Sequence, residues 1–279
     1  MDSLKTPMQI DVESVLYDKN PGLKKVLPRF LVRYLKRIVH QDDINELLRE
    51  NGDMRGFAFN DAVLAKMGIK YHVHGSDKLP PGGRNIFVSN HPLGGLDGMV
   101  FISELSKHYN SIKFPVNDIL LYIDNYSEIF LPVNKHGALG REAARLLEEA
   151  YLSDCQILNF PAGICSRKIK GKITDLAWQK SFIIKAIKHQ RDVIPCYFAG
   201  RNSAFFYNLS LIRNFLGIRA NFEMLYLVDE MYRQKGKEID LYFGDPVPWQ
   251  TFDKSKSPQE WSEWVRSKTY NLRERVNTR

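Results

Sequence analysis

The segment Ile86-Phe-Val-Ser-Asn-His-Pro-Leu-Gly-Gly-Leu-Asp-Gly98 joins an apolar run to a glycine-rich loop and then to a helical pattern. The β-branched and aromatic residues Ile86–Ser89 predict a buried strand, and a helix is expected over 97–108. A strand that passes through a short loop into a helix is the building unit of α/β proteins. This segment therefore predicts an α/β fold.

The same alternation continues on both sides of this unit. Further β-rich runs lie at Ile69–His74, Ile112–Val116, Ile129–Val133, Cys155–Phe160, Val193–Phe198 and Ile239–Phe243. Helical patterns lie between them over 139–152 and 178–190, and Ser257-Pro258-Gln259-Glu260 predicts the capped start of a last helix. We therefore expect a largely buried mixed sheet flanked by helices over 69–279, preceded by an N-terminal helical segment over 1–68.

Composition excludes several classes of protein. The 279 residues are 44% hydrophobic and 26% charged, which is typical of a chain with a sizeable core and not of a disordered one. Three cysteines without Cys-x-x-Cys spacing exclude a disulfide framework and favour a reducing, cytoplasmic compartment. No apolar run reaches the roughly 18 residues of a membrane span, and we expect no secretion signal. The net charge of +8 and the absence of phosphate-loop or dinucleotide motifs do not indicate nucleotide or nucleic-acid chemistry.

The stretch 20–40 carries six basic residues and no acidic one, while apolar residues recur at three- and four-residue steps. This pattern predicts a basic amphipathic helix, interrupted near Pro28. Such a helix binds an anionic membrane interface, or it packs on the protein's own core with a solvated basic face. The pattern favours neither alternative.

His91 and Asp97 are the residues of the opening segment that can carry chemistry. Histidine is the commonest general base near neutral pH, and a carboxylate beside it fixes its tautomer and stabilises the imidazolium. Gly94 and Gly95 allow the loop to fold tightly enough for the two side chains to meet. The alternative is that the pair only closes the loop and caps the helix.

Several blocks in a fixed order resemble those of the glycerolipid (lysophosphatidic acid) acyltransferase superfamily. Asn90-His91 with Asp97 is similar to its Asn-His-x4-Asp signature, and Phe160-Pro-Ala-Gly-Ile-Cys-Ser-Arg167 to its Phe-Pro-Glu-Gly-x-x-Ser-Arg block. Ile129–Lys135, Val193–Tyr197 and Phe243–Pro248 resemble its remaining strands. The blocks span most of the chain, from about Tyr71 to Pro248, and 69–279 is identified as an acyltransferase domain.

This chain departs from the superfamily pattern in two ways. Five residues instead of four separate His91 from Asp97, and Ala162 replaces the usual glutamate of the third block. We interpret the first as a loop insertion at Gly94-Gly95 and the second as a sign of an acceptor headgroup other than glycerol phosphate. Both departures resemble the bacterial hemolysin-like branch, which includes O-acyltransferases of lyso-amino-acid lipids.

The resemblance implies a reaction and a set of roles. His91 removes a proton from the hydroxyl of a lyso-lipid, which attacks the thioester of acyl carrier protein or coenzyme A, and Asp97 orients His91. No metal and no bound cofactor are implied. Substrate-binding roles are carried over to Lys135, Arg141, Gly163, Ser166 and Arg167. The implied location is peripheral, on the cytoplasmic face of the inner membrane, against an anionic surface.

Other readings of the chain remain open. A non-catalytic peripheral lipid-binding protein with the same fold is the main alternative, and Ala162 is its best support. A lipid esterase lacks the Gly-x-Ser-x-Gly elbow it needs, and Cys165 is a weaker candidate nucleophile than a hydroxyl activated by His91. His72 and His74 share a strand face, but no third ligand accompanies them, so we expect no metal site. The apolar run Phe205–Ile212 either lines an acyl tunnel, touches lipid or packs in the core.

Overall fold

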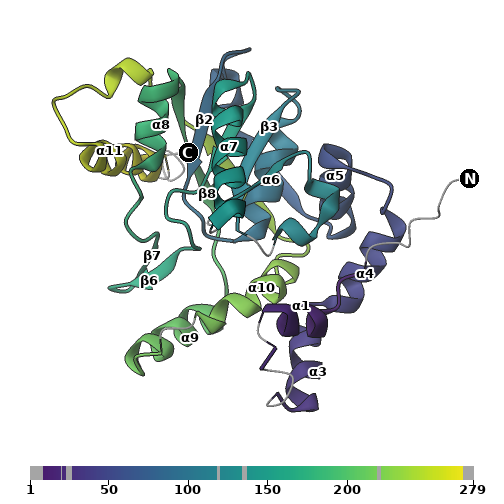
Figure 1. Cartoon of the computed structure of the whole chain (residues 1–279). Coiled ribbons are helices and arrows are strands. Elements are labelled where there is room, and N and C mark those ends of the chain that lie inside the picture. The colour runs from purple at the N-terminus through teal and green to yellow at the C-terminus, as the bar shows by residue number, and fades with distance from the viewer. Residues whose placement is uncertain are drawn as a thin grey trace, which may run out of the picture.

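The protein is described by a computed structural model over residues 9–19, 21–22, 27–117, 120–133, 137–218 and 221–272 (Figure 1). Within these residues one seven-stranded sheet forms the centre of the molecule. Its strands, in spatial order, are β1 (Lys70–His74), β9 (Glu238–Phe243), β8 (Asp192–Ala199), β2 (Asn85–Ser89), β5 (Gln156–Asn159), β3 (Ile112–Val116) and β4 (Phe130–Pro132). Strands β8, β2, β5, β3 and β4 are parallel, whereas β1 and β9 run in the opposite direction. The predicted mixed sheet is confirmed.

Side chains of the central strands alternate between two apolar cores because successive residues of a strand point to opposite faces. Phe87 and Leu158 lie in one core with residues of α5 (Gly56–Lys66) and α6 (Gly95–Leu105). Ile86 and Ile157 lie in the other, with residues of α7 (Gly137–Leu152), α8 (Ser181–His189) and α11 (Pro258–Asn271). The sheet is thus covered on both faces, as Figure 1 shows.

A local signal fixes the start of the last predicted helix, α11 (Pro258–Asn271). In α11 the Ser257 side chain accepts from the backbone of Glu260, and the Glu260 side chain accepts from the backbone of Ser257, so the predicted capping box is present. Trp178 and Phe182, at the start of the pattern predicted over 178–190, are fully buried.

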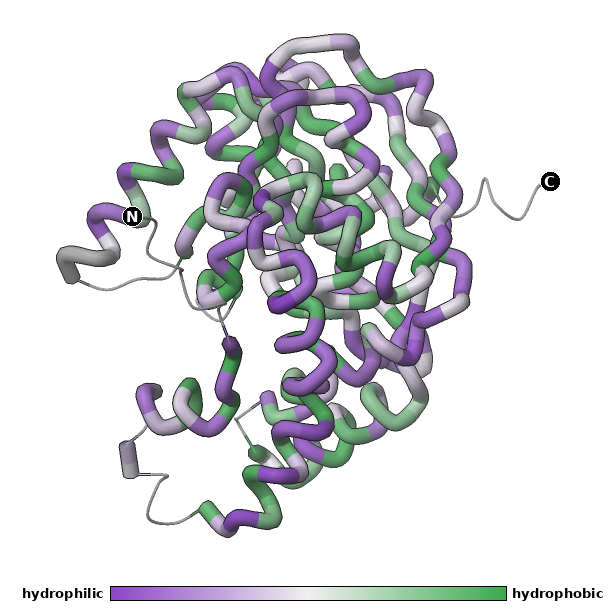
Figure 2. The backbone as a smooth tube through the Cα atoms, turned by 90° about the vertical axis from the view of Figure 1, so that its right-hand side faces the viewer, coloured by the Kyte–Doolittle hydropathy of each residue, from purple (hydrophilic) through white to green (hydrophobic). Residues whose placement is uncertain are grey.

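The N-terminal segment consists of α1 (Val12–Lys19), α3 (Arg29–Ile38), α4 (Gln41–Glu50) and α5. Helix α3 begins directly after Pro28, whereas positions 20 and 23–26 of the predicted basic helix lie outside the described residues. It buries Val32 and Ile38, while Phe30 is 68% exposed. Figure 2 shows hydrophobic and hydrophilic stretches alternating along these helices. No helix in the described part of the chain is both long and apolar enough to cross a bilayer.

A short hairpin and the two helices after β8 were not predicted. The basic stretch 167–172 forms part of an antiparallel hairpin of β6 (Arg167–Ile169) and β7 (Lys172–Thr174). Its turn residues Lys170 and Gly171 both have positive φ, which is the conformation of a tight two-residue hairpin turn. Helix α9 (Ala204–Phe215) and the short helix α10 (Leu227–Tyr232), joined through a 3-10 turn at Phe222–Tyr226, follow strand β8. Helix α9, the 3-10 turn and helix α10 form an arm at one end of the molecule (Figure 1).

Candidate active site

The predicted catalytic loop lies at the carboxyl edge of the five parallel strands. Strand β2 ends at Ser89, and α6 begins at Gly95, so 90–94 form the connection. The Asn90 side chain fixes this connection to β8, because it donates to the Phe198 carbonyl over 2.9 Å and accepts from the Phe198 N–H over 2.7 Å. Gly94 has φ +73°, where a side chain would be strained and would meet Cys165 Sγ at 3.2 Å. Ligand sites of α/β folds occupy this edge of the sheet.

His91 and Asp97 meet as predicted. His91 Nδ1 lies 3.0 Å from Asp97 Oδ2, which also accepts from the Leu93 N–H over 2.8 Å. An ionised carboxylate only accepts hydrogen bonds, so Nδ1 carries the proton and the lone pair is on Nε2. Nε2 has no hydrogen-bond partner among the described residues, and the His91 side chain is 17% exposed. The imidazole therefore presents a basic nitrogen to an incoming group.

Asp97 is completely buried at the first turn of α6. Burial raises the pKa of Asp97 above its usual value, and the hydrogen bond from His91 opposes that rise. A buried carboxylate is most stable beside a cation, since its own hydration is lost. Asp97 is therefore placed to stabilise a positive charge on the His91 ring.

The third block lies against the same histidine. The Phe160 ring stacks on the His91 ring with centroids 4.1 Å apart and an interplanar angle of 19°. The Ser166 N–H donates to the His91 carbonyl over 2.8 Å. The third block thus contacts both the ring and the backbone of His91, which restricts the orientation of the imidazole.

Asp175 is a buried residue of this site that the sequence analysis missed. Its carboxylate accepts from the His91 N–H over 3.2 Å, from Ser166 Oγ over 2.5 Å and from Trp178 Nε1 over 2.9 Å. It joins the catalytic loop, the third block and the segment before α8 at one point. A signal was present in the sequence, because Asp175 is the lone acidic residue between Cys155 and Arg191.

Two of the predicted substrate-binding residues, Ser166 and Arg167, are buried beside the catalytic loop. Ser166 is buried, and its hydroxyl donates to Asp175. Arg167 is also buried, and its guanidinium donates to the Cys165 carbonyl over 2.9 Å and lies 3.2 Å from Glu223. Both therefore lie next to the site with their polar groups already engaged by protein partners. Their substrate-binding roles stay predictions.

Three further predicted positions complete the set. Gly163 has φ +73° and closes a turn in which its N–H donates to the Phe160 carbonyl over 2.9 Å. Arg141 is an exposed residue of α7, and Lys135 lies outside the described residues. Ala162 is buried in an apolar cluster with Trp178 and Phe182, where a glutamate would lose its hydration.

The competing chemistries find little support in the geometry. Cys165 is fully buried, and burial raises the pKa of its thiol, so a thiolate nucleophile is disfavoured there. His72 and His74 lie against Glu238 and Asp240 of the neighbouring strand, at 3.3 and 2.8 Å. In the described residues no group of three or more possible ligands is arranged to hold a metal ion.

The chain is similar in sequence to known acyltransferases. A family model described as "Acyltransferase" matches residues 14–279. A lyso-glycine lipid O-acyltransferase from Bacteroides thetaiotaomicron is 46% identical over 264 residues, which are 94% of this chain and 97% of that protein. Another from Phocaeicola vulgatus is 44% identical over 94% of this chain and 95% of its own length. The chain belongs to the acyltransferase family, and the predicted resemblance is confirmed.

A solved structure is also similar. The crystal structure of the 1-acyl-sn-glycerophosphate (LPA) acyltransferase PlsC from Thermotoga maritima covers 90% of this chain and 93% of its own, with 17% identity and a TM-score of 0.47.

Proposed function

We propose that this acyltransferase moves a fatty acyl group from an acyl thioester to the hydroxyl of a lyso-lipid, and that its acceptor is a lyso-glycine lipid. The observation that carries the proposal is the His91–Asp97 pair, with a buried carboxylate on Nδ1 and an unoccupied Nε2. The names of the two relatives that are more than 40% identical support the acceptor class.

The reaction needs one base and no covalent enzyme intermediate. His91 Nε2 takes the proton of the acceptor hydroxyl while the oxygen forms a bond to the thioester carbonyl carbon. The tetrahedral intermediate then expels the thiolate of the donor, and this thiolate takes the proton from His91. One thioester is broken, one ester is formed, and a free thiol leaves. Asp97 stabilises the imidazolium between the two proton transfers.

The donor and the location belong to the same proposal. Acyl carrier protein or coenzyme A carries the acyl group, with Lys135, Arg141 or Arg167 near the anionic part of a substrate. The enzyme works peripherally on the cytoplasmic face of an anionic membrane, in membrane lipid biosynthesis.

The test is an acyl-transfer assay with purified full-length protein and product detection by mass spectrometry. Acyl carrier protein and coenzyme A thioesters are each paired with lyso-glycine lipid and with lysophosphatidic acid. We expect ester product with lyso-glycine lipid and little with lysophosphatidic acid. Equal or greater turnover of lysophosphatidic acid would contradict the acceptor assignment, and no product with any pair would contradict the activity.

A further inference from the structure

Helix α9 and the turn after it expose large apolar side chains. We call them the α9 surface, and its residues are Phe205, Leu211, Ile212, Phe215, Leu216 and Ile218. Phe215 is 90% exposed, Leu216 62% and Ile212 55%. Contiguous apolar patches of this kind are rare on soluble proteins except where something binds. The arm that carries them projects from the rest of the molecule in Figure 1.

The last two turns of α9 have an inverted polarity. The face turned toward the protein carries Ser210 and Arg213, which are both buried. The face turned outward carries Leu211, Ile212 and Phe215. A helix that meets only water places its apolar stripe inward and its charges outward. The outer face of α9 is therefore suited to an apolar environment.

A buried ion cluster holds the helix in this orientation. Glu223 is fully buried and lies 2.9 Å from Arg213 Nε and 3.2 Å from Arg167 Nη2. The Arg167 guanidinium also lies over the Phe206 ring, 5.3 Å from its centroid. Turning α9 over would separate Arg213 from Glu223, and this would be costly because buried charges would lose their partners. The outward apolar face is a feature of the packed structure.

Positive charge borders the α9 surface. Strand β6 contacts α9, and its hairpin exposes Lys168, Lys170 and Lys172. No acidic residue occurs in the sequence from Cys155 to Thr174 or from Val193 to Phe222. An apolar patch bordered by lysines is complementary to a bilayer with anionic headgroups, to which each lysine near the surface contributes attraction. An apolar protein partner would not require the basic border.

The α9 surface also continues toward the N-terminal helices. The Tyr34 hydroxyl of α3 lies 2.7 Å from the Tyr226 hydroxyl, and the Tyr226 ring meets the Phe205 ring edge-on at 5.0 Å. One turn before Tyr34, Phe30 is exposed. Helices α3 and α9 lie at the same end of the molecule in Figure 1.

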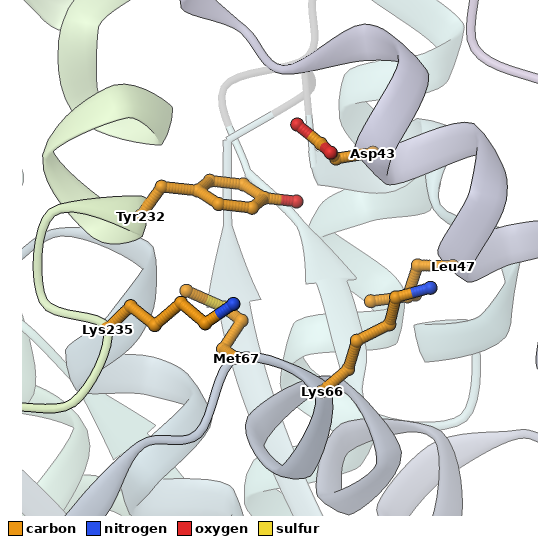
Figure 3. A pocket seen from close by; sticks show the side chains of 6 residues that line it. All are labelled: Asp43, Leu47, Lys66, Met67, Tyr232 and Lys235. Atoms are coloured by element: carbon orange, nitrogen blue, oxygen red, sulfur yellow. The ribbon is translucent and has the colours of Figure 1, made fainter.

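Helix α10 is fastened to the N-terminal helices as well. The Tyr232 ring stacks on His40 with centroids 4.0 Å apart. Figure 3 shows Tyr232 and Lys235 facing Asp43 and Lys66 across a small pocket, none of whose lining residues belongs to the catalytic loop. The arm and the N-terminal helices are thus joined at both ends of α10.

We propose that the α9 surface and the β6–β7 hairpin dock the protein on an anionic phospholipid bilayer. Cys165, which lies next to Ser166 and against Gly94 of the catalytic loop, packs with Phe206 and Tyr207 on the inner face of α9. Docking through the outer face brings the site close to the headgroup region. If the proposed function holds, this is where a lyso-lipid acceptor presents its hydroxyl.

The test is flotation of the full-length protein with phosphatidylcholine vesicles, with and without phosphatidylglycerol. The variant Ile212→Ser/Phe215→Ser/Leu216→Ser is expected to bind both kinds of vesicle at least about tenfold more weakly, since it removes three inserting side chains. The matched control is Ile184→Ser/Ile187→Ser on α8, which changes apolar side chains of 45% and 38% exposure and is expected to bind like wild type. Thermal melts check that both variants fold.

A second variant tests the charges. Lys168→Gln/Lys170→Gln/Lys172→Gln is expected to lose the salt-sensitive part of binding to phosphatidylglycerol vesicles and to leave phosphatidylcholine binding unchanged. Unchanged vesicle binding in the α9 serine variant would overturn the proposal. So would a change from dimer to monomer in that variant without lipid, because a second copy would then cover this face.

Docking and catalysis are measured separately. With acceptor below its critical micelle concentration, the α9 serine variant is expected to turn over like wild type, and with vesicle-embedded acceptor it is expected to be slower. An inactive wild type that still floats with vesicles would refute the proposed function and leave the docking surface standing.

Discussion

Replacing Asp97 by asparagine separates catalysis from folding more cleanly than any other change at this site. The two side chains have the same shape, so the loop and α6 keep their packing. The asparagine oxygen can still accept from the Leu93 N–H, which now donates to Asp97 Oδ2 over 2.8 Å. What the variant loses is the negative charge beside His91 Nδ1.

The size of that loss follows from the distance between the charges. An ion pair at about 4 Å with an effective dielectric constant of about 20 contributes roughly 4 kcal/mol. At about 1.36 kcal/mol for each factor of ten, the imidazolium state becomes harder to reach by a factor of about 10³. Stability changes less, because two effects of the substitution oppose each other. The neutral side chain avoids the desolvation that raises the pKa of Asp97, but its amide replaces Asp97 Oδ1, which is buried without a hydrogen-bond partner among the described residues.

We therefore expect Asp97→Asn to lower kcat by roughly 10³ while Tm stays close to that of the wild type. The assay is single-turnover acyl transfer at saturating donor and acceptor, with thermal melts of the same preparations. Near-wild-type kcat would refute the role of Asp97. A loss of activity that parallels a loss of Tm would show that Asp97 acts only in closing the loop.

Three further changes probe the surroundings of the site. The Asp175 carboxylate accepts three hydrogen bonds, and Asp175→Asn replaces one accepting oxygen by an amide N–H that faces a donor. We expect the free energy of unfolding, measured by urea denaturation, to fall by about 2 kcal/mol. An unaltered midpoint would argue against a stabilising role of these hydrogen bonds. Glu223→Gln leaves two buried arginines without a counter-charge, and the same measurement should show a loss of roughly 3 kcal/mol or more. Hydrogen bonds from Lys185 and Lys188 lower the pKa of Glu148 from 4.5 to about 2, so its stabilising effect is complete above pH 4.5 and lost as the pH falls through about 2. Glu148→Gln should therefore be less stable than wild type by about 1 kcal/mol or less near neutral pH, with the difference vanishing in acid.

The sheet was predictable because its signals are local. Each predicted strand is a short apolar run between turn residues, and the structure places all seven in one sheet. The His91–Asp97 contact was predictable for a similar reason, since the two residues are six positions apart in a loop with Gly94. A tight loop leaves few ways to arrange such a pair.

Elements whose signal depends on distant partners were missed. The run that forms α9 was ambiguous, because its inward face includes Arg213, whose burial depends on the pairing with Glu223 of the turn after the helix. The sequence shows the cationic charge of Arg167 but not its pairing with the buried carboxylate of Glu223, 56 residues away. Asp175 likewise acts on atoms of His91 that lie 84 positions earlier.

The central claim is that His91 acts as the base in acyl transfer, and the most direct measurement compares His91→Ala with His72→Ala. His72 is an exposed strand histidine paired with Glu238, so it controls for the loss of an imidazole. Both proteins are assayed with lyso-glycine lipid and each acyl thioester, after thermal melts confirm that they fold. The account predicts wild-type turnover for His72→Ala and a loss of at least about 10³ for His91→Ala. Comparable turnover in the two variants would contradict it.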